Sequence, residues 1–250
     1  MVRPASNEGS PIFECVALDG ATKDTIPARC SLIDKFLFQR YPSERSFYNS
    51  GGGGYFYTEG RFSVVVPAGR LIVRLEHGFE YESAVDTLNV TADTTVVYEL
   101  QRKISMNTLG WYSGDCHMHI NHYGGIYSMT PEDALYIAEA EGLNVVNCLD
   151  NDYYFTGAPD PCSTKNCKVY MTIENRSASY GHMGLLGLKR LFYPFSSNWS
   201  PLLIDVEDSV HAQPGAIAVY AHPVTTNDFD DKSQSVFWCC EHRGGTVACI

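Results

Sequence analysis

Hydrophobic and polar positions alternate in short runs along the first part of the chain. Between residues 12 and 109 these runs are rich in Val, Ile, Leu, Phe and Tyr, several have a period of two, and turn residues separate them. Pro67, Ala68 and Gly69 predict a tight hairpin between two runs. The pattern predicts a small antiparallel β-sandwich domain over residues 1–109. Its strands are predicted at residues 29–38, 54–57, 62–66, 70–75 and 95–100.

From Trp111 onward the pattern changes to strands that alternate with helices. Thr130 is a favoured N-cap, Pro131 suits the first helical position, and Gly142 ends the apolar periodicity, so a helix is predicted between them. A second helix is predicted near residues 204–212. Alternation of this kind builds parallel sheets or barrels, which we expect over residues 110–250. The predicted strands cover residues 143–149, 168–173, 182–188 and 216–221.

Side chains that bind metals follow the predicted strands of this second part. His117 and His119 are one residue apart, so their imidazoles project to the same side of an extended chain. Taken singly, each such residue is more commonly solvated or part of a core. At the carboxyl ends of parallel strands, however, they would converge on one pocket. Among the further candidates, Asp150, Asp152, Glu174 and His222 follow other predicted strands, and His182 opens one.

Charge and composition narrow the classes of partner. Asp and Glu outnumber Lys and Arg by 29 to 18, giving a formal net charge of -11, and no basic run is present. We therefore expect neither nucleic acid nor a membrane as a partner. Residues 1–8 lack the apolar stretch of a signal peptide. The chain is predicted to be cytoplasmic, or periplasmic or secreted if a signal segment precedes it. The number of subunits is not predicted.

Several segments together resemble one family of enzymes. The segment WYSGDCHMH at 111–119 looks like the opening motif of the PHP (polymerase and histidinol phosphatase) superfamily, and more narrowly of its CehA/McbA branch. The family's acid position is similar to ENRS at 174–177, and its late histidine to AHP at 221–223. Proteins of this branch commonly place a small β-sandwich first. Two further segments are similar to the family pattern: AEGLNVV at 140–146 and GHMGLLG at 181–187.

The resemblance implies a ligand set and a role for each residue. His117 and His119 would bind one metal ion, and Glu174 would bridge two ions. His182 and His222 would bind a second or third ion, with Zn, Mn or Fe as the expected metals. Asp115 would be an acid that orients an imidazole, and with Glu174 it would form the catalytic pair.

The sequence also departs from the family pattern. LDND at 149–152 replaces the usual Asp-His after the second strand, and the closing Asp-x-His motif is not present. The resemblance therefore implies an incomplete, distorted (β/α) barrel after the sandwich.

Two classes of function follow. The first is a metal-dependent hydrolase, in which a metal-activated water attacks a carbamate, ester, amide or phosphoester bond of a small-molecule substrate. The alternative is a non-catalytic protein, in which the β-sandwich binds a carbohydrate or a protein and the second half is a degenerate metal-binding unit.

Overall fold

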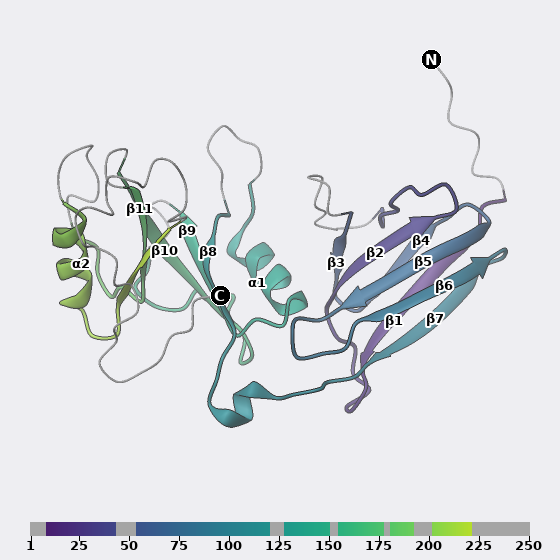
Figure 1. The fold of residues 1–250 in the computed structure, drawn as a ribbon, viewed down its shortest axis with the longest axis horizontal. Coiled ribbons are helices and arrows are strands. Elements are labelled where there is room, and N and C mark those ends of the chain that lie inside the picture. Colours follow the sequence, from purple (N-terminus) through teal and green to yellow (C-terminus); the bar gives the residue numbers. More distant parts are fainter. Residues whose placement is uncertain are drawn as a thin grey trace, which may run out of the picture. The chain divides into compact units, whose positions relative to one another are not determined.

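The chain divides into two compact units, each described separately below. The computed structural model describes residues 9–43, 54–120, 128–150, 155–177, 181–192 and 202–221. The first unit comprises Met1–Ser113 and Tyr136–Leu143, and the second comprises Gly114–Leu135 and Asn144–Ile250. Figure 1 shows the strands of the first unit in purple to blue and those of the second in teal to yellow-green.

Three strands of the first unit form a sheet in the order β4-β1-β7. Strand β1 (Ile12–Asp19) pairs antiparallel with β4 (Arg61–Val65) but parallel with β7 (Thr94–Leu100). The prediction of a wholly antiparallel sandwich is therefore wrong. The connection from β1 to β7 runs through five other strands, and a connection that long lets a strand enter in either direction. Period-two alternation does not encode that direction.

Four strands form the second sheet of this unit in the order β3-β2-β5-β6, and all its pairs are antiparallel. In β2 the side chains alternate between buried and half-buried, as the period-two pattern predicts. The hairpin predicted at residues 67–69 is wrong, because β4 and β5 belong to different sheets. These residues instead carry the chain from one sheet to the other. The bounds are Ala28–Asp34 for β2, Phe56–Thr58 for β3, Gly69–Glu76 for β5 and Ala84–Val90 for β6.

The two sheets of the first unit share one hydrophobic core. Phe13 and Leu100 come from the first sheet, and Leu32, Phe56 and Leu75 from the second; all five are at most 1% exposed. Burial of such side chains stabilises a fold by about 1.5 to 3 kcal/mol each. The apolar side chains on the inward faces of these strands therefore stabilise the unit. The 3-10 helix η1 (Met106–Leu109) follows these strands.

The second unit contains a five-stranded sheet in the order β12-β11-β10-β9-β8. Strands β8, β9 and β10 are parallel to one another, whereas β11 and β12 continue the sheet antiparallel. The sheet is therefore mixed, with β8 and β12 at its two edges. The bounds are Gly114–Met118 for β8, Val145–Asp150 for β9, Lys168–Ser177 for β10, Gly181–Leu186 for β11 and Ile217–Tyr220 for β12.

Both predicted helices are present. Helix α1 spans Pro131–Ala140, and at its start Thr130 Oγ1 accepts the backbone N–H of Asp133, while the Asp133 carboxylate accepts that of Thr130. Gly142 follows with a φ of 66°, which glycine adopts without strain. Helix α2 (Leu203–His211) packs Val206 and Val210 against the sheet.

The predicted fold class, a sandwich followed by an incomplete (β/α) barrel, is wrong. A barrel needs a crossover of a dozen or more residues before each new parallel strand. Here β11 begins four residues after β10 ends, and it runs back antiparallel. The described part of the connection from β9 to β10, residues 155–167, contains turns and no helix. The second half therefore forms an open mixed sheet over its described residues.

Candidate metal centre

The end of β8 carries two histidines on one side. His117 lies in the strand, and His119 follows directly after its last residue, Met118. The Asp115 carboxylate accepts the backbone N–H of His117 at 2.8 Å, and Asn147 Nδ2 donates to the Asp115 carbonyl at 3.1 Å. These bonds hold the strand end where the register between β8 and β9 shifts. Strand alternation then directs both imidazoles to the same side.

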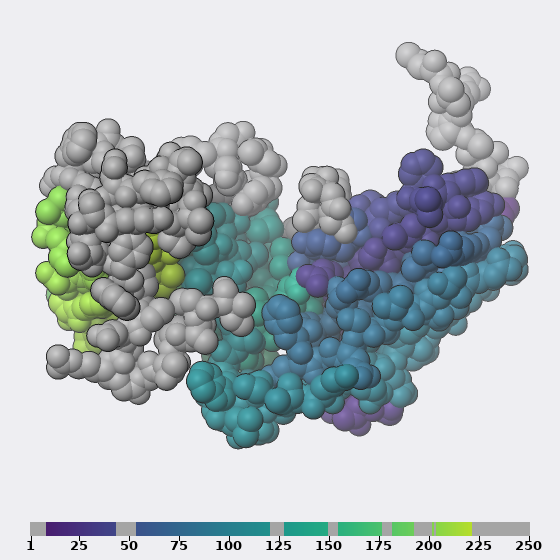
Figure 2. Space-filling model, in the orientation of Figure 1, coloured from purple at the N-terminus to yellow at the C-terminus, as the bar shows by residue number. Residues whose placement is uncertain are grey.

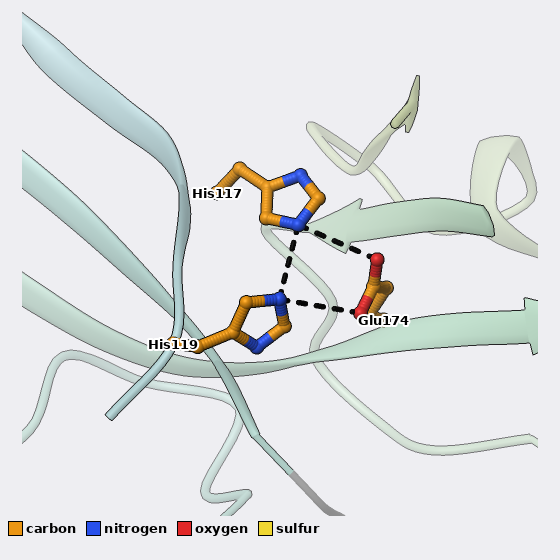
Figure 3. A group of neighbouring side chains, drawn as sticks. All are labelled: His117, His119 and Glu174. Atoms are coloured by element: carbon orange, nitrogen blue, oxygen red, sulfur yellow. Dashed lines mark hydrogen bonds and ion pairs between the residues drawn. The ribbon is translucent and has the colours of Figure 1, made fainter. Parts of the chain in front are cut away.

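Glu174 supplies the third group from β10. This strand is two positions away from β8 in the sheet, with β9 between them. The Glu174 side chain is only 2% exposed, although a carboxylate is rarely buried without partners. Figure 3 shows its carboxylate facing the two imidazole rings. The site thus joins residues that are far apart in the sequence.

The ligand-type atoms of these three side chains converge. His117 Nε2 and His119 Nε2 are 3.0 Å apart; His117 Nε2 lies 3.4 Å from Glu174 Oε1, and His119 Nε2 lies 3.4 Å from Glu174 Oε2 (Figure 3). All three donor atoms lie within 4.8 Å of one another. Within the described parts of the chain, this is the one group of three or more His, Cys, Asp or Glu side chains with such spacing.

The hydrogen bonds of His119 define which of its nitrogens is available. Its Nδ1 lies 2.7 Å from the backbone carbonyl of Leu149, at the end of β9. A carbonyl only accepts, so Nδ1 carries the proton and the neutral ring presents the lone pair of Nε2 to the site. Arg176 Nη2 is also 3.3 Å from Nδ1, but a guanidinium only donates and cannot serve as its acceptor. A backbone carbonyl in this position is typical of metal-binding histidines.

Glu174 is held as an anion. Burial by itself raises its pKa, but hydrogen bonds from His182 and Arg176, and the positive charge of Arg176, outweigh burial and lower the pKa to about 2. Arg176 Nε lies 2.5 Å from Oε2, and His182 Nδ1 lies 3.2 Å from Oε1. The carboxylate is therefore charged at neutral pH and oriented from two sides.

The structure brings some of the predicted site residues together and leaves others outside the group. His117, His119 and Glu174 come together, whereas His182 contacts Glu174 from outside the three-residue group. Asp115 accepts a backbone N–H of the strand end, and no described bond joins its carboxylate to an imidazole. His222 lies outside the described residues, as does Asp152, and the side chain of Asp150 is also not described.

Two contributions to the site were not predicted. The Leu149 carbonyl, which orients His119, is a backbone group and has no sequence signature. The second is the ion pair of Arg176 with Glu174. The spacing of these residues on β10 does contain the signal, since residues i and i+2 share one face of a strand.

Comparisons with known proteins add little to this geometry. A scan against family models finds no match, and no curated protein matches the chain. Solved structures that match include the pilus 2b backbone protein of group B streptococcus, with a TM-score of 0.29, 12% identity and coverage of 37% of this chain and 41% of that one. A minor pilin of Streptococcus agalactiae matches with a TM-score of 0.29, 10% identity and coverage of 39% and 46%.

The major pilin subunit of Bacillus cereus matches with a TM-score of 0.24, 13% identity and coverage of 37% of this chain and 30% of that one. This chain thus spans less than half the length of the pilin structures that it matches. At these TM-scores the likeness assigns neither a fold nor a role to the chain.

The assignment to the PHP superfamily is wrong, and so is the prediction of a metal-dependent hydrolase. No family model matches the chain, so none supports that assignment. The described part of the second unit is an open mixed sheet, so its strand ends do not close into the barrel on which the enzyme assignment depended. What the structure shows is a β-rich protein with a cluster of potential ligands.

The described helices were also compared with the length and hydropathy that a membrane span requires. None of them is long and apolar enough to cross a bilayer.

Proposed function

We propose that this chain is a non-catalytic, β-rich binding protein that holds one divalent transition-metal ion between His117, His119 and Glu174. The observation that carries the proposal is the convergence of two imidazole Nε2 atoms and a buried carboxylate within 4.8 Å. Two imidazole nitrogens and an anion that face one another this closely are favourable only with a proton or a cation between them.

The spacing of the three groups supports a first-row metal. Nitrogen and oxygen ligands lie about 2.0 to 2.2 Å from zinc, so two ligands at a tetrahedral angle are separated by about 3.3 to 3.6 Å. In the site each Nε2 atom lies 3.4 Å from a different oxygen of Glu174, within this range, and the two Nε2 atoms are 3.0 Å apart, slightly closer than it. Imidazole together with carboxylate suits Zn, Mn or Fe better than Ca or Mg, which prefer oxygen ligands.

The positions of the ligands suggest what the ion would do. His117 and His119 are attached to β8 and Glu174 to β10, so an ion bound to all three would cross-link strands that are not neighbours. Binding energy of this kind stabilises the folded state directly. Three protein ligands also leave a coordination position for water or a ligand from outside.

The proposal is tested by calorimetric titration of the metal-depleted full chain with Zn²⁺ and with Mn²⁺. We expect the His117→Ala and His119→Ala variants each to weaken the tighter binding event by at least about 100-fold, because each loses a direct ligand. A suitable control is His211→Ala, since His211 is exposed at the end of α2.

Circular dichroism and thermal unfolding of each metal-free variant distinguish a variant that has lost a metal ligand from one that no longer folds. Absence of binding by the wild-type chain would contradict the proposal. So would a His119→Ala variant that binds either ion as tightly as the wild-type chain does.

A further inference from the structure

A turn in the first unit exposes three large apolar side chains in succession. Phe36, Leu37 and Phe38 follow β2 and are 58%, 75% and 64% exposed. Single exposed apolar residues are ordinary on protein surfaces, but a contiguous group commonly marks an interaction site. We call residues 36–38 the apolar tip. Figure 2 shows the dark purple-blue segment that follows β2 at the surface of this unit.

The apolar tip is held in one conformation. Asp34, which is 2% exposed, accepts the backbone N–H groups of Phe36 and Phe38 through Oδ1 at 2.8 and 3.0 Å. Its Oδ2 accepts Arg40 Nε at 2.7 Å. Leu37 has a φ of 67°, in the left-handed region that disfavours branched side chains. A buried acid with three partners thus fixes a strained turn that presents apolar groups to solvent, and such strain is often found at functional sites.

Other apolar side chains are exposed at the same end of the first unit. Lys35 Nζ donates to the carbonyl of Ala68 at 2.7 Å, which places the apolar tip beside the connection from β4 to β5. In the β1–β4 pair, Ile12 lies opposite Val65, and these two side chains are 39% and 45% exposed. The exposed apolar surface therefore extends beyond the apolar tip itself.

The charges at this end differ from those of the whole chain. Arg40 and Asp34 neutralise each other as an ion pair. Among the remaining described groups, Lys35 and Arg70 are exposed cations, and Glu14 and Asp93 are exposed anions; Asp93 accepts the backbone N–H of Ile12. Positive and negative side chains are thus balanced here, although acids outnumber bases by 29 to 18 in the chain, and Lys35 is the charge next to the apolar tip.

We propose that the apolar tip inserts into the interfacial layer of a lipid bilayer that contains anionic lipids. Consecutive side chains on a tight turn project in several directions, a convex shape that a fluid layer accommodates without a matching pocket. Phenylalanine and leucine enter the boundary between headgroups and acyl chains, and binding strength grows with the apolar area buried. Lys35 Nζ lies 5.0 Å from the Phe36 ring, so the ammonium would sit near the headgroups.

This surface contact is distinct from a membrane span and is independent of the metal centre. The expectation that no membrane is a partner rested on the net charge of the chain. Attraction to anionic headgroups acts within about 10 Å, so the local charges determine it.

The test is flotation of the full chain with vesicles of phosphatidylcholine alone and of phosphatidylcholine mixed in equal parts with phosphatidylglycerol. The chain is expected to float with the mixed vesicles and more weakly with phosphatidylcholine alone. The triple variant Phe36→Ser, Leu37→Ser and Phe38→Ser is expected to lose at least about tenfold in vesicle partitioning. The matched control is Val85→Ser with Val97→Ser, which removes exposed apolar side chains from β6 and β7.

A second variant guards against loss of folding. Leu37→Gly fits the positive φ of that position, so it is expected to keep the turn while it weakens partitioning. Wild-type chain that stays unbound to both vesicles, or a triple variant that floats as well as the wild type, would overturn the proposal. Sedimentation that shows self-association of the wild type, lost in the triple variant, would instead assign the apolar tip to contact between copies.

Discussion

Two carboxylates with arginine partners, one in each unit, have different surroundings. In the first unit, Glu76 accepts bonds from Arg29 Nη2 at 2.9 Å and from Arg74 Nε at 3.0 Å. In the second unit, Glu174 accepts Arg176 Nε at 2.5 Å. Burial raises the pKa of each carboxyl, and in both cases the arginines help to outweigh burial so that the pKa falls below its ordinary value.

The two sites differ in what else faces the carboxylate. The further bond described for Glu76 comes from Ser83 Oγ, which donates, so the groups around Glu76 supply the protons that it needs. Glu174 is more deeply buried and also faces Nε2 of His117 and His119. An arginine pair by itself is therefore a structural feature. We propose a metal site where imidazole nitrogens of neighbouring side chains also meet the same anion.

The largest effect expected from this comparison is on metal affinity. Glu174→Gln keeps the shape of the side chain but removes its charge, so the Kd for Zn²⁺ should rise by about 100-fold, or about 2.7 kcal/mol. Glu76→Gln should leave that Kd unchanged. Calorimetric titration measures both, and an equal loss in the two variants would show that the effect is not local to the site.

The next effect is on stability and belongs to the first unit. Arg29 donates to Glu76 and, through Nη1, to Glu141 at 2.9 Å, and its side chain is 33% exposed. Arg29→Ala should lower the free energy of unfolding by about 1 to 2 kcal/mol, because two half-buried carboxylates lose a donor. Arg74→Ala should cost about 0.5 kcal/mol or less, since Arg74 is 55% exposed. Urea unfolding measures the free energy of unfolding of both variants. Equal losses in the two variants would contradict the expected difference between Arg29 and Arg74.

A smaller effect of opposite direction is expected for Arg176. Its guanidinium occupies Glu174 Oε2 and repels an incoming dication. Arg176→Gln should therefore lower the Kd for Zn²⁺ by up to about fivefold. A Kd that rises in this variant would mean that Arg176 acts mainly by orienting the carboxylate.

The smallest effect concerns pH and Glu76. Because the pKa of Glu76 is lowered in the folded chain from its ordinary value of 4.5, its contribution to stability is present above that value. This contribution is lost as the pH falls through the lowered pKa. The free energy of unfolding of the wild-type chain should therefore decrease more steeply below pH 4.5 than that of Glu76→Gln. Parallel pH profiles from urea unfolding would contradict this assignment.

The sequence predicts local structure better than it predicts topology. The N-cap at Thr130 and the stop at Gly142 specify α1, and the alternation in β2 specifies which of its side chains are buried. Strand direction is not encoded in this way. The parallel pairing of β7 with β1 and the antiparallel return of β11 both depend on long-range packing, so the predicted barrel failed even though its strands are present.

The candidate site was likewise predictable only in its local features. His117 and His119 share a side because side chains alternate along any strand, whatever the sheet. Their proximity to Glu174 depends on β8 and β10 being aligned across β9, which the parallel half of the sheet retains. His182 was expected as a ligand from its place at a predicted strand and from a family pattern, and in the structure this residue bonds to Glu174 from outside the group. The Leu149 carbonyl depends on backbone placement alone.

The central claim is that His117, His119 and Glu174 hold a divalent metal ion. Crystals of the full chain grown with Zn²⁺, measured at the zinc absorption edge, test it most directly. The account predicts an anomalous peak bonded to Nε2 of both histidines and to a carboxylate oxygen of Glu174. An anomalous map with no peak at these three side chains, from a chain that is otherwise ordered there, would contradict it.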